Sequence, residues 1–303
     1  MPTQNFTTPL YAINTATTLS KYSANVLRLL HDEGGNIYSS TDVTSCINEA
    51  RNRVVGDTAC LRALQVWCLN TNQEAYQIGQ IPAVLVTNGG SGYVSPTVTF
   101  SGGGATTTAT ATATVSGGKI IAINITNPGA GYDMVNSQVT MTISDSVGFG
   151  ATFVFGAPSM STLAVLGFSL NYSTTRYALD WKPWSTFSAK LRYWINTIQQ
   201  PVCWAEYSGT VYVAPIPDQV YSVEEDSLFF PVPLVNPTDT DSIPIRYQSP
   251  IVYYAAHLLK YSEQSFGESD EFMAKYNEVL HNCIGSSIQR RIPSQYTTNS
   301  TGY

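Results

Sequence analysis

Apolar residues recur at helical spacing in the first part of the chain. From about Ser20 they follow each other at three- and four-residue steps until Gly34-Gly35, which predicts a helix. A second predicted helix follows at once, and Ser40 or Thr41 caps it by accepting a hydrogen bond from an unpaired backbone N–H. Its apolar stripe comprises Val43, Ile47, Ala50 and Val54. The next segment, which continues this helix or begins a short third one, holds Cys60, Leu61, Leu64 and Trp67.

Two more helices are predicted near the end of the chain. Pro250 suits the first turn of a helix, because its missing N–H costs little there, and this helix runs from Ile251 to Tyr261. Gly267 separates it from a helix that spans Ser269 to about Ile288, whose apolar residues again keep helical spacing. The chain is therefore expected to begin and end with helical segments.

The middle of the chain has a different pattern. From about Gly79 to Ala157 the sequence is rich in Thr, Val, Ala and Gly and holds almost no Lys, Arg, Asp or Glu. Residues 106–115 alternate Thr with Ala, and residues 119–125 alternate polar with β-branched residues, so both predict strands. Gly117-Gly118 between them supplies the positive φ angles that a tight hairpin turn requires. This composition predicts an inserted β domain.

Part of this middle segment nearly repeats itself. Thr87-Asn88-Gly89-Gly90-Ser91-Gly92-Tyr93 returns as Thr126-Asn127-Pro128-Gly129-Ala130-Gly131-Tyr132, and a Val- and Thr-rich alternating segment follows each copy. Self-similarity at a spacing of about forty residues indicates duplicated supersecondary units, made here of turns and strands. The repeat favours a scaffold with a projecting binding or packing element over a compact enzyme.

Short elements are predicted between the insertion and the last helices. Residues 181–187 resemble a turn that enters a helix, with Ser185 as its cap. Residues 204–213 predict two short strands around a Ser-Gly turn. Residues 228–234 predict another strand, which its two prolines confine to a sheet edge.

Together these patterns predict an α+β protein with a helical core and short β hairpins. Residues 1–78 form the N-terminal helical half of that core, and residues 158–292 form its C-terminal half, with hairpins followed by two helices. Residues 79–157 form a small inserted all-β domain that is rich in Gly and Thr and duplicated internally. Residues 293–303 form an extended C-terminal tail with too few apolar residues to fold alone.

Composition indicates that much of the surface is covered by other chains. Charged residues make up only 12% of the sequence, which contains 19 tyrosines, whereas a soluble domain carries about 25% charged residues. A surface poor in Lys and Glu but rich in aromatic groups is typical of interfaces. We therefore expect a stable oligomer or a permanent complex.

The charge balance argues against tight DNA binding. A net charge of −6, with a sequence pI near 5.0, offers no clustered positive footprint for phosphates. A weak negative charge suits a conduit through which DNA slides, and it suits an ordinary soluble protein as well.

Cysteines and the N-terminal residues favour synthesis in the cytoplasm. The five cysteines are odd in number and form no CxxC pair, so we expect small buried thiols in a reducing compartment. The first residues lack the basic start and the apolar stretch of a signal peptide. No apolar run is long enough to span a membrane, so we expect no membrane partner.

The sequence offers few groups for catalysis. Only His31, His257 and His281 are present, and none lies in a known catalytic or metal-binding motif. We expect His257 to be a hydrogen-bonded core residue. Gly117-Gly118-Lys119 lacks the earlier glycine and the following Ser or Thr of a phosphate-binding loop. We therefore expect no catalytic residue, no metal site and no cofactor, and the protein is not expected to be an enzyme.

Acidic and aromatic clusters keep a second class of function open. Glu224-Glu225-Asp226 and Asp239-Thr240-Asp241 offer paired carboxylates for calcium binding or glycoside hydrolysis, but solvated loop acids are the favoured interpretation. The tryptophans either line a sugar platform or fill the core, and the core is favoured. They are Trp181, Trp184, Trp194 and Trp204.

The segments outside the insertion resemble a known family. Tyr38-Ser39-Ser40-Thr41-Asp42-Val43, running into Ile47-Asn48-Glu49-Ala50-Arg51-Asn52-Arg53-Val54, resembles the opening helices of head-to-tail adaptor proteins, or connectors, of short-tailed bacteriophages. The resemblance covers about residues 20–78 and 160–292 and rests on pattern and order. Later blocks follow in the order of that family; they are Gln200-Pro201-Val202-Cys203-Trp204-Ala205, Val211-Tyr212-Val213-Ala214-Pro215-Ile216-Pro217-Asp218, Pro250-Ile251-Val252-Tyr253-Tyr254-Ala255-Ala256 and Glu268-Ser269 to Tyr276.

The resemblance implies a virion structural protein at the head–tail junction, made in the host cytoplasm. Such a protein forms a ring of twelve copies that joins the portal protein to the tail nozzle protein, and DNA passes through its channel without specific binding. Tail fibres are a further expected partner. The C-terminal segment of the family reaches the portal, and the expected contacts are Arg290, Arg291 and Tyr296, because Arg and Tyr are favoured interface anchors. A basic helix end followed by a loose tail explains the same residues equally well.

Two other functions stay open. A carbohydrate-binding or carbohydrate-active protein would hold a glycan with the repeat module and the tryptophans, in a concave site with paired carboxylates beside Trp181 or Trp204. A fibre-attachment or decoration protein would use the insertion as its binding module and the helices as a base.

Overall fold

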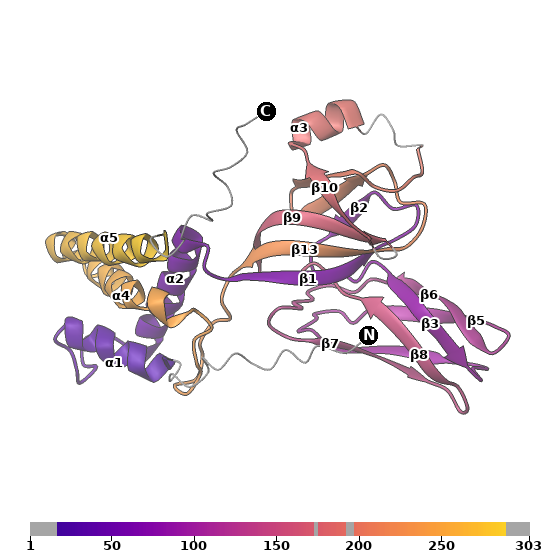
Figure 1. The fold of residues 1–303 in the computed structure, drawn as a ribbon. Coiled ribbons are helices and arrows are strands. Elements are labelled where there is room, and N and C mark those ends of the chain that lie inside the picture. The colour runs from indigo at the N-terminus through magenta and orange to yellow at the C-terminus, as the bar shows by residue number, and fades with distance from the viewer. Residues whose placement is uncertain (1–16, 173–174, 192–196, 289–303) are drawn as a thin grey trace. The chain divides into compact units, whose positions relative to one another are not determined.

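The computed structural model describes residues 17–172, 175–191 and 197–288. The chain divides into two compact units, whose elements Figure 1 labels. One unit combines the two ends of the chain, up to Leu61 and from Phe230 onwards, and the other spans Arg62–Phe229. Because both ends of the chain build the first unit, the second is inserted into it.

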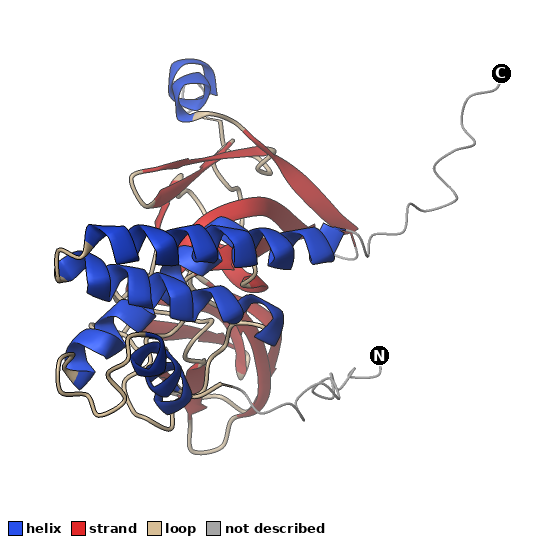
Figure 2. Cartoon of the chain, turned by 90° about the vertical axis from the view of Figure 1, so that its left-hand side faces the viewer, coloured by secondary structure: helices blue, strands red, loops and turns tan. Residues whose placement is uncertain are grey.

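Helices form the first unit. Within its described residues they are α1 (Leu19–Leu29), α2 (Ser40–Thr58), α4 (Ser249–Ser262) and α5 (Phe266–Ile288). Helix α4 is central, because it packs against α1, α2 and α5, and Figure 2 shows the helices of this unit alongside one another in blue. Their apolar faces share one core, in which Ile47, Ile251 and Tyr276 are fully buried.

A buried ion pair joins the two chain ends of this unit. Arg51 on α2 donates from Nη2 and Nε to Asp241 Oδ1, at 2.7 and 3.1 Å, and the two side chains are 1% and 0% exposed. Asp241 Oδ2 accepts a hydrogen bond from the Tyr22 hydroxyl of α1 at 2.7 Å. Arg51 also donates to the carbonyl of Val232 at 2.7 Å. One side chain therefore holds α2 to the segment that follows the inserted unit.

The inserted unit contains two curled sheets. The first has seven strands in the order β1-β13-β9-β10-β11-β12-β2, and only the β10–β11 pair is parallel. The strands are β1 (Arg62–Leu69), β2 (Ala75–Gln77), β9 (Thr162–Tyr172), β10 (Thr175–Trp181), β11 (Cys203–Tyr207), β12 (Thr210–Ala214) and β13 (Tyr221–Phe229). Phe168 packs between Trp67 and Trp204 in its core, with ring centroids 5.3 and 5.5 Å away. Helix α3 (Trp184–Thr186) and a π-helical turn (Phe187–Leu191) follow β10.

The second sheet has six antiparallel strands in the order β7-β4-β5-β6-β3-β8. They are β3 (Val84–Ser91), β4 (Thr97–Gly102), β5 (Thr110–Ser116), β6 (Lys119–Asn127), β7 (Val139–Ser144) and β8 (Phe149–Phe155). The sheet has its own core around Tyr93, Phe100 and Tyr132. The Gly79 amide donates to the Pro158 carbonyl at 2.6 Å, so the chain enters and leaves this sheet at one place.

The two sequence repeats form equivalent halves of the six-stranded sheet. Asn88 Oδ1 accepts from the Gly90 amide at 3.0 Å, and Asn127 Oδ1 accepts from the Gly129 amide at 2.9 Å. The two glycines have φ angles of 63° and 68°, a left-handed conformation that glycine adopts without steric cost. The β-bulges of the β3–β8 and β5–β6 pairs also fall at matching positions.

The tyrosine that ends each repeat contacts the other half of the sheet. The Tyr93 hydroxyl accepts from the amide of Ala151 on β8 at 3.4 Å, and the Tyr132 hydroxyl accepts from the amide of Ala109, just before β5, at 2.7 Å. Strand β8 belongs to the second repeat and β5 to the first. Each half therefore forms a hydrogen bond with the tyrosine of the other half, so the two halves stabilise each other.

Most local predictions are confirmed. The four helices occur where the apolar spacing predicts them, although Ser39, one residue before the predicted cap, caps α2 by accepting from the Asp42 amide at 3.1 Å. Gly117-Gly118 forms the turn between β5 and β6, and Ser208-Gly209 forms the turn between β11 and β12. Each of these features depends on neighbouring residues alone.

The prediction of a helical core is wrong. Two curled sheets of seven and six strands dominate the described part of the chain, and its helices are few. The larger sheet pairs segments that are far apart in sequence, as where Arg62 lies opposite Leu228. Local periodicity contains no sign of such pairing, so each strand resembles an isolated hairpin arm.

Three individual elements also differ from the prediction. The segment after α2 is not helical, because Arg62–Leu69 forms β1, whose two faces both carry apolar residues and so hide the period of two. The strand expected over residues 228–234 ends at Phe229 and begins at Tyr221. Ser185 does not cap α3, whose N-cap is Pro183.

The Arg51–Asp241 pair should contribute far more than an exposed pair on the same helix. Arg51→Met leaves the Asp241 carboxylate buried without its cation, which should lower the free energy of unfolding by about 3–5 kcal/mol. Arg53→Met is the matched control, because the Arg53–Asp57 pair is largely exposed and should cost under about 0.5 kcal/mol. Urea unfolding measures both, and equal losses would contradict the assigned role.

The repeat glycines should differ from a glycine in open space. A Cβ at Gly129 would lie 2.6 Å from the Thr107 carbonyl oxygen, whereas a Cβ at Gly104, which also has positive φ, meets nothing within 4 Å. Gly104→Ala should cost about 1–2 kcal/mol for the left-handed conformation. Gly129→Ala should cost about 1–3 kcal/mol more for the overpacking. Thermal unfolding of the two variants measures the difference, and identical melting temperatures would exclude the steric explanation.

Candidate functional site

The predicted portal contacts, Arg290, Arg291 and Tyr296, lie outside the described residues. The described part of the inserted unit offers three other candidate features: a pocket, a buried carboxyl group and a group of aromatic side chains.

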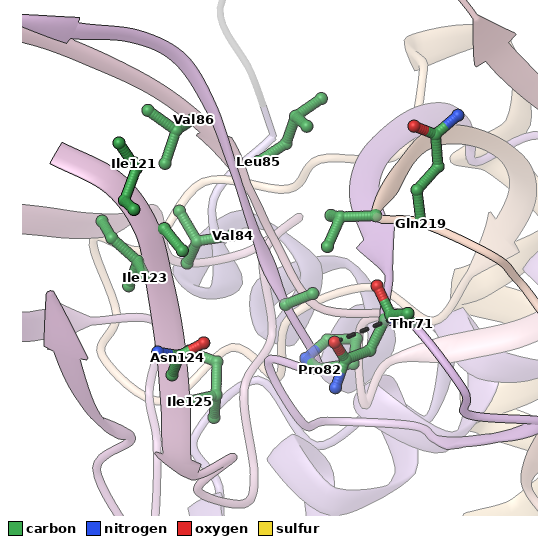
Figure 3. Close-up of a pocket in the computed structure, with 14 residues that line it drawn as sticks. Thr71, Pro82, Val84, Leu85, Val86, Ile121, Ile123, Asn124, Ile125 and Gln219 are labelled. Carbon is green, nitrogen blue, oxygen red and sulfur yellow. Dashed lines mark hydrogen bonds between the residues drawn. The ribbon is translucent and has the colours of Figure 1, made fainter. Parts of the chain in front are cut away.

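A pocket of about 440 Å³ lies beside strands β3 and β6. The two strands pair at one register position, where Val84 lies opposite Ile123. Figure 3 shows Val84, Val86, Ile121 and Ile123 together on one side, and Thr71 and Gln219 on the other. The first group comes from the six-stranded sheet, and the second comes from loops of the seven-stranded sheet.

The pocket contains no charged side chain. Its polar groups are one hydroxyl and three amides, from Thr71, Asn70, Asn124 and Gln219. Part of this hydrogen-bonding capacity is already used, because Asn70 Oδ1 accepts from the Thr71 amide at 3.0 Å and Asn124 Nδ2 donates to Thr114 Oγ1 at 3.2 Å. The lining residues therefore supply no acid, base or metal ligand of high affinity, and they suit an uncharged group.

A buried glutamate lies on the inner face of the seven-stranded sheet. Glu225 on β13 is 0% exposed. Its Oε2 accepts from Trp67 Nε1 at 2.8 Å, and its Oε1 accepts from the Ser227 hydroxyl. No Lys or Arg of the described ranges forms an ion pair with it. Burial therefore raises the pKa of the Glu225 carboxyl, because its charged form loses hydration.

Hydrogen bonds connect Glu225 to the segment that follows the six-stranded sheet. Gln65 Nε2 lies 3.5 Å from Glu225 Oε1, and Gln65 Oε1 accepts from the amide and the hydroxyl of Ser159 at 3.1 and 2.6 Å. Ser159 Oγ accepts from the Val135 amide at 3.2 Å. Since every member of this network is inside the unit, its role is to fix loops against the sheet.

The expectation that the acidic clusters are solvated loop residues holds for Asp239, which lies in a loop and is not buried, but it is wrong for the other four acids. Glu224 and Asp226 lie on β13 and form ion pairs with Arg176 and Arg62 on the strand face opposite to Glu225. Asp241 is buried in the other unit. The signal that identifies Glu225 as an inward residue is the strand period of two, which places it with Val223 and Phe229, both buried.

The tryptophans do not form one site. Trp204 is buried in the sheet core, and Trp181 is exposed. Trp184 stacks on Tyr207 with ring centroids 4.6 Å apart and an interplanar angle of 14°. Trp194 lies outside the described residues. Of the described members of the predicted cluster, Trp204 lies in the sheet core, and Trp184 packs against a second buried cluster that includes Phe187.

His257 is hydrogen-bonded at a helix interface, as predicted, but it is only partly buried and so is not a core residue. Its Nδ1 lies 2.8 Å from Ser269 Oγ and 2.9 Å from the Ser269 carbonyl oxygen, which joins α4 to α5. Ser269 is fully buried, so a substrate has no access to its hydroxyl. The pair resembles a nucleophile and its base in distance only.

Comparison with known proteins assigns no function to the chain. No protein-family model matches it, and no curated protein is similar to it in sequence. Within the described ranges, no three His, Cys, Asp or Glu side chains gather as a metal site. None of the helices described has the length and apolar character to cross a membrane. A function must be inferred from the residues of the chain itself.

Glu225 should make stability depend on pH. Its folded pKa lies above its unfolded value, so above about pH 4.3 the unfolded chain loses this proton first and the folded state is destabilised. Glu225→Gln keeps an acceptor for Trp67 and removes this effect. The stability gain of the variant should grow from pH 5 to pH 7.5, by up to about 1.4 kcal/mol per pH unit below the folded pKa.

Urea unfolding at the two pH values measures this gain. Glu224→Gln, on the opposite face of the same strand, is the control for the removal of a carboxylate that is only partly buried. The same stability difference at both pH values for Glu225→Gln would contradict a raised pKa of the Glu225 carboxyl in the folded state.

Proposed function

We propose that this chain is a head-to-tail adaptor of a short-tailed bacteriophage. The observation that carries the proposal is the location of the blocks that resemble that family. Three of these blocks, residues 38–54, 250–256 and 268–276, are widely separated in sequence, yet they lie at α2, α4 and α5 of one unit, whereas residues 200–205 and 211–218 lie at β11 and β12 of the other unit. In such a protein, twelve copies form a ring that joins the portal protein to the tail nozzle protein.

Polar contacts tie helix α2, which carries the first of these blocks, to the chain segment that follows the inserted unit. Asn48 on α2 donates to the Leu234 carbonyl and accepts from the Leu234 amide, both at 2.9 Å. Its neighbour Arg51 makes the buried pair with Asp241. The unit therefore has the internal order that a ring subunit requires when identical copies pack side by side.

Exposed apolar side chains at one corner of the helical unit support packing against another copy. We define the apolar corner as Ile37, Tyr261 and Phe266, all of which are exposed. The rings of Tyr261 and Phe266 are 5.4 Å apart. The loop that carries Ile37 reaches the same corner, because the Tyr38 hydroxyl donates to Glu263 Oε2 at 2.7 Å. Gathered apolar groups of this kind are typical of interfaces.

The distribution of charge supports a channel in which DNA is not held. The chain carries 15 Lys and Arg against 21 Asp and Glu. Arg62 and Arg176, both more than half exposed, are paired with Asp226 and Glu224. Positive charge that is neutralised within the chain gives little affinity for phosphate.

Arg290, Arg291 and Tyr296 stay the proposed portal contacts, and the virion is the proposed location.

A fibre-attachment or decoration protein is the second candidate. The observation that favours it is the connection of the six-stranded sheet, whose two ends meet where the Gly79 amide bonds the Pro158 carbonyl. Such a module can be added to a scaffold without disturbing it. In that case the module, and not the helical unit, would bind the partner.

Excision of the module separates the two candidates. Residues 80–157 can be replaced by a short Gly-Ser linker, because the flanking residues already touch. An adaptor should still cosediment with portal particles from the same source, whereas a decoration protein should lose its binding. Circular dichroism checks that the shortened chain is folded.

A point variant covers the case in which the excised chain does not fold. Phe266→Ser in the apolar corner should leave a folded monomer that fails to complete a ring on the portal. Lys275→Ser, on the same helix, is the control. Loss of portal binding on excision of a folded chain, with no effect of Phe266→Ser, would contradict the adaptor proposal.

A further inference from the structure

The six-stranded sheet has two equivalent ends, and they differ in what covers them. We define the docked pole as Tyr132 with Ala105, Thr107 and Asp133. We define the free pole as Tyr93 with Val94, Val147 and Phe149. The strand register shows that the two ends are equivalent. Ser91 lies opposite Phe149 at the free pole, and Ala130 lies opposite Thr107 at the docked pole.

At the docked pole, the chain segment that leaves the module binds Tyr132 and Asp133, whereas Thr107 stays exposed. The Met160 amide donates to the Tyr132 carbonyl at 2.9 Å, and the Ser161 hydroxyl donates to Asp133 Oδ1 at 2.8 Å. The segment 158–161 therefore binds this pole through its backbone and one hydroxyl. Tyr132 beneath it is fully buried.

The free pole has only part of this cover. The Tyr93 amide donates to the Gly118 carbonyl at 3.0 Å, just as the Tyr132 amide donates to the Gly79 carbonyl at 3.0 Å. The hairpin turn between β5 and β6 thus replaces the segment that enters the module. Among the described residues, no donor to the Tyr93 carbonyl is found, so nothing there replaces the segment 158–161.

The two poles also differ in chemistry at equivalent positions. The docked pole carries Asp133, Ala105 and Thr107, whereas the free pole carries Val94, Val147 and Phe149. The latter three are 76%, 66% and 69% exposed. Since the docked pole folds with small or polar residues at these positions, the fold does not require apolar ones. Exposed apolar groups that folding does not need indicate a binding surface.

Asp145 holds the free pole in a fixed shape. Its Oδ2 accepts from the amides of Val94 and Ser95 at 3.1 and 2.9 Å, and its Oδ1 accepts from the amides of Val147 and Gly148 at 3.0 and 2.9 Å. Two loops that carry the apolar residues are therefore ordered before any partner arrives. A preorganised surface loses less conformational entropy on binding.

We propose that the free pole binds a short, uncharged peptide segment of another protein chain, in the way that residues 158–161 bind the docked pole. A backbone amide of that segment would bond the Tyr93 carbonyl, and an apolar side chain of the segment would cover the exposed apolar residues. This inference concerns the inserted module and stands independently of the proposed adaptor function.

The test uses the full chain and a synthetic peptide with the sequence of residues 156–162, which contains the segment found on the docked pole. Backbone amide NMR shifts are followed as the peptide is added. We expect saturable shifts at Val94, Val147 and Phe149. The double variant Val147→Ala/Phe149→Thr, which carries the residues of the docked pole, should bind at least tenfold more weakly. Val235→Ala, which removes an exposed apolar group in the other unit, should bind like the unmodified chain.

Three outcomes would overturn the proposal. The first is the absence of saturable shifts at millimolar peptide. The second is a set of shifts at the pocket of Figure 3 that the double variant does not change. The third is self-association without peptide that the double variant abolishes, which would assign the free pole to a second copy of this chain. Circular dichroism shows whether the double variant is folded.

Discussion

The arrangement of the helical unit depends on one buried ion pair. Arg51 and Asp241 are 190 residues apart, and the whole β unit is inserted between them. Desolvating both charges is costly, but further bonds offset that cost, because the carboxylate also accepts from Tyr22 and from the Ile243 amide. A fully bonded polar network in a dry interior favours a single arrangement. The place where the chain leaves the helices and the place where it returns are thereby held together.

The structure of the six-stranded sheet follows from the duplication in its sequence. The two repeats have the same asparagine turn, the same left-handed glycine and the same tyrosine, and each tyrosine bonds the backbone of the other half. Such a module necessarily has two similar ends. Its connection to the rest of the unit occupies one of them, through the segment 158–161. The other keeps the same backbone geometry and carries large apolar groups, so the module has one surface for its own chain and one for a partner.

Sequence predicts the features of this chain that depend on neighbouring residues. Helical spacing identifies α2 and α4, and the repeat identifies the turns at Asn88 and Asn127. The seven-stranded sheet could not be predicted, because β1 pairs with β13 across more than half of the chain and both faces of β1 are partly apolar. The tyrosine contacts could not be predicted either, since their partners are backbone amides, which do not depend on the type of residue. The burial of Glu225 could have been predicted from the strand period of two, but its acidic neighbours on the opposite face made the segment resemble a loop.

The adaptor proposal combines a helical unit that holds three of the family-like blocks, an apolar corner suited to a neighbouring copy and a net charge of −6. The mass of the purified protein, alone and after mixing with portal particles from the same source, followed by electron microscopy of any complex, tests this combination most directly. The proposal predicts a ring that appears only with the portal. A discrete monomer or trimer that does not associate with the portal would contradict it.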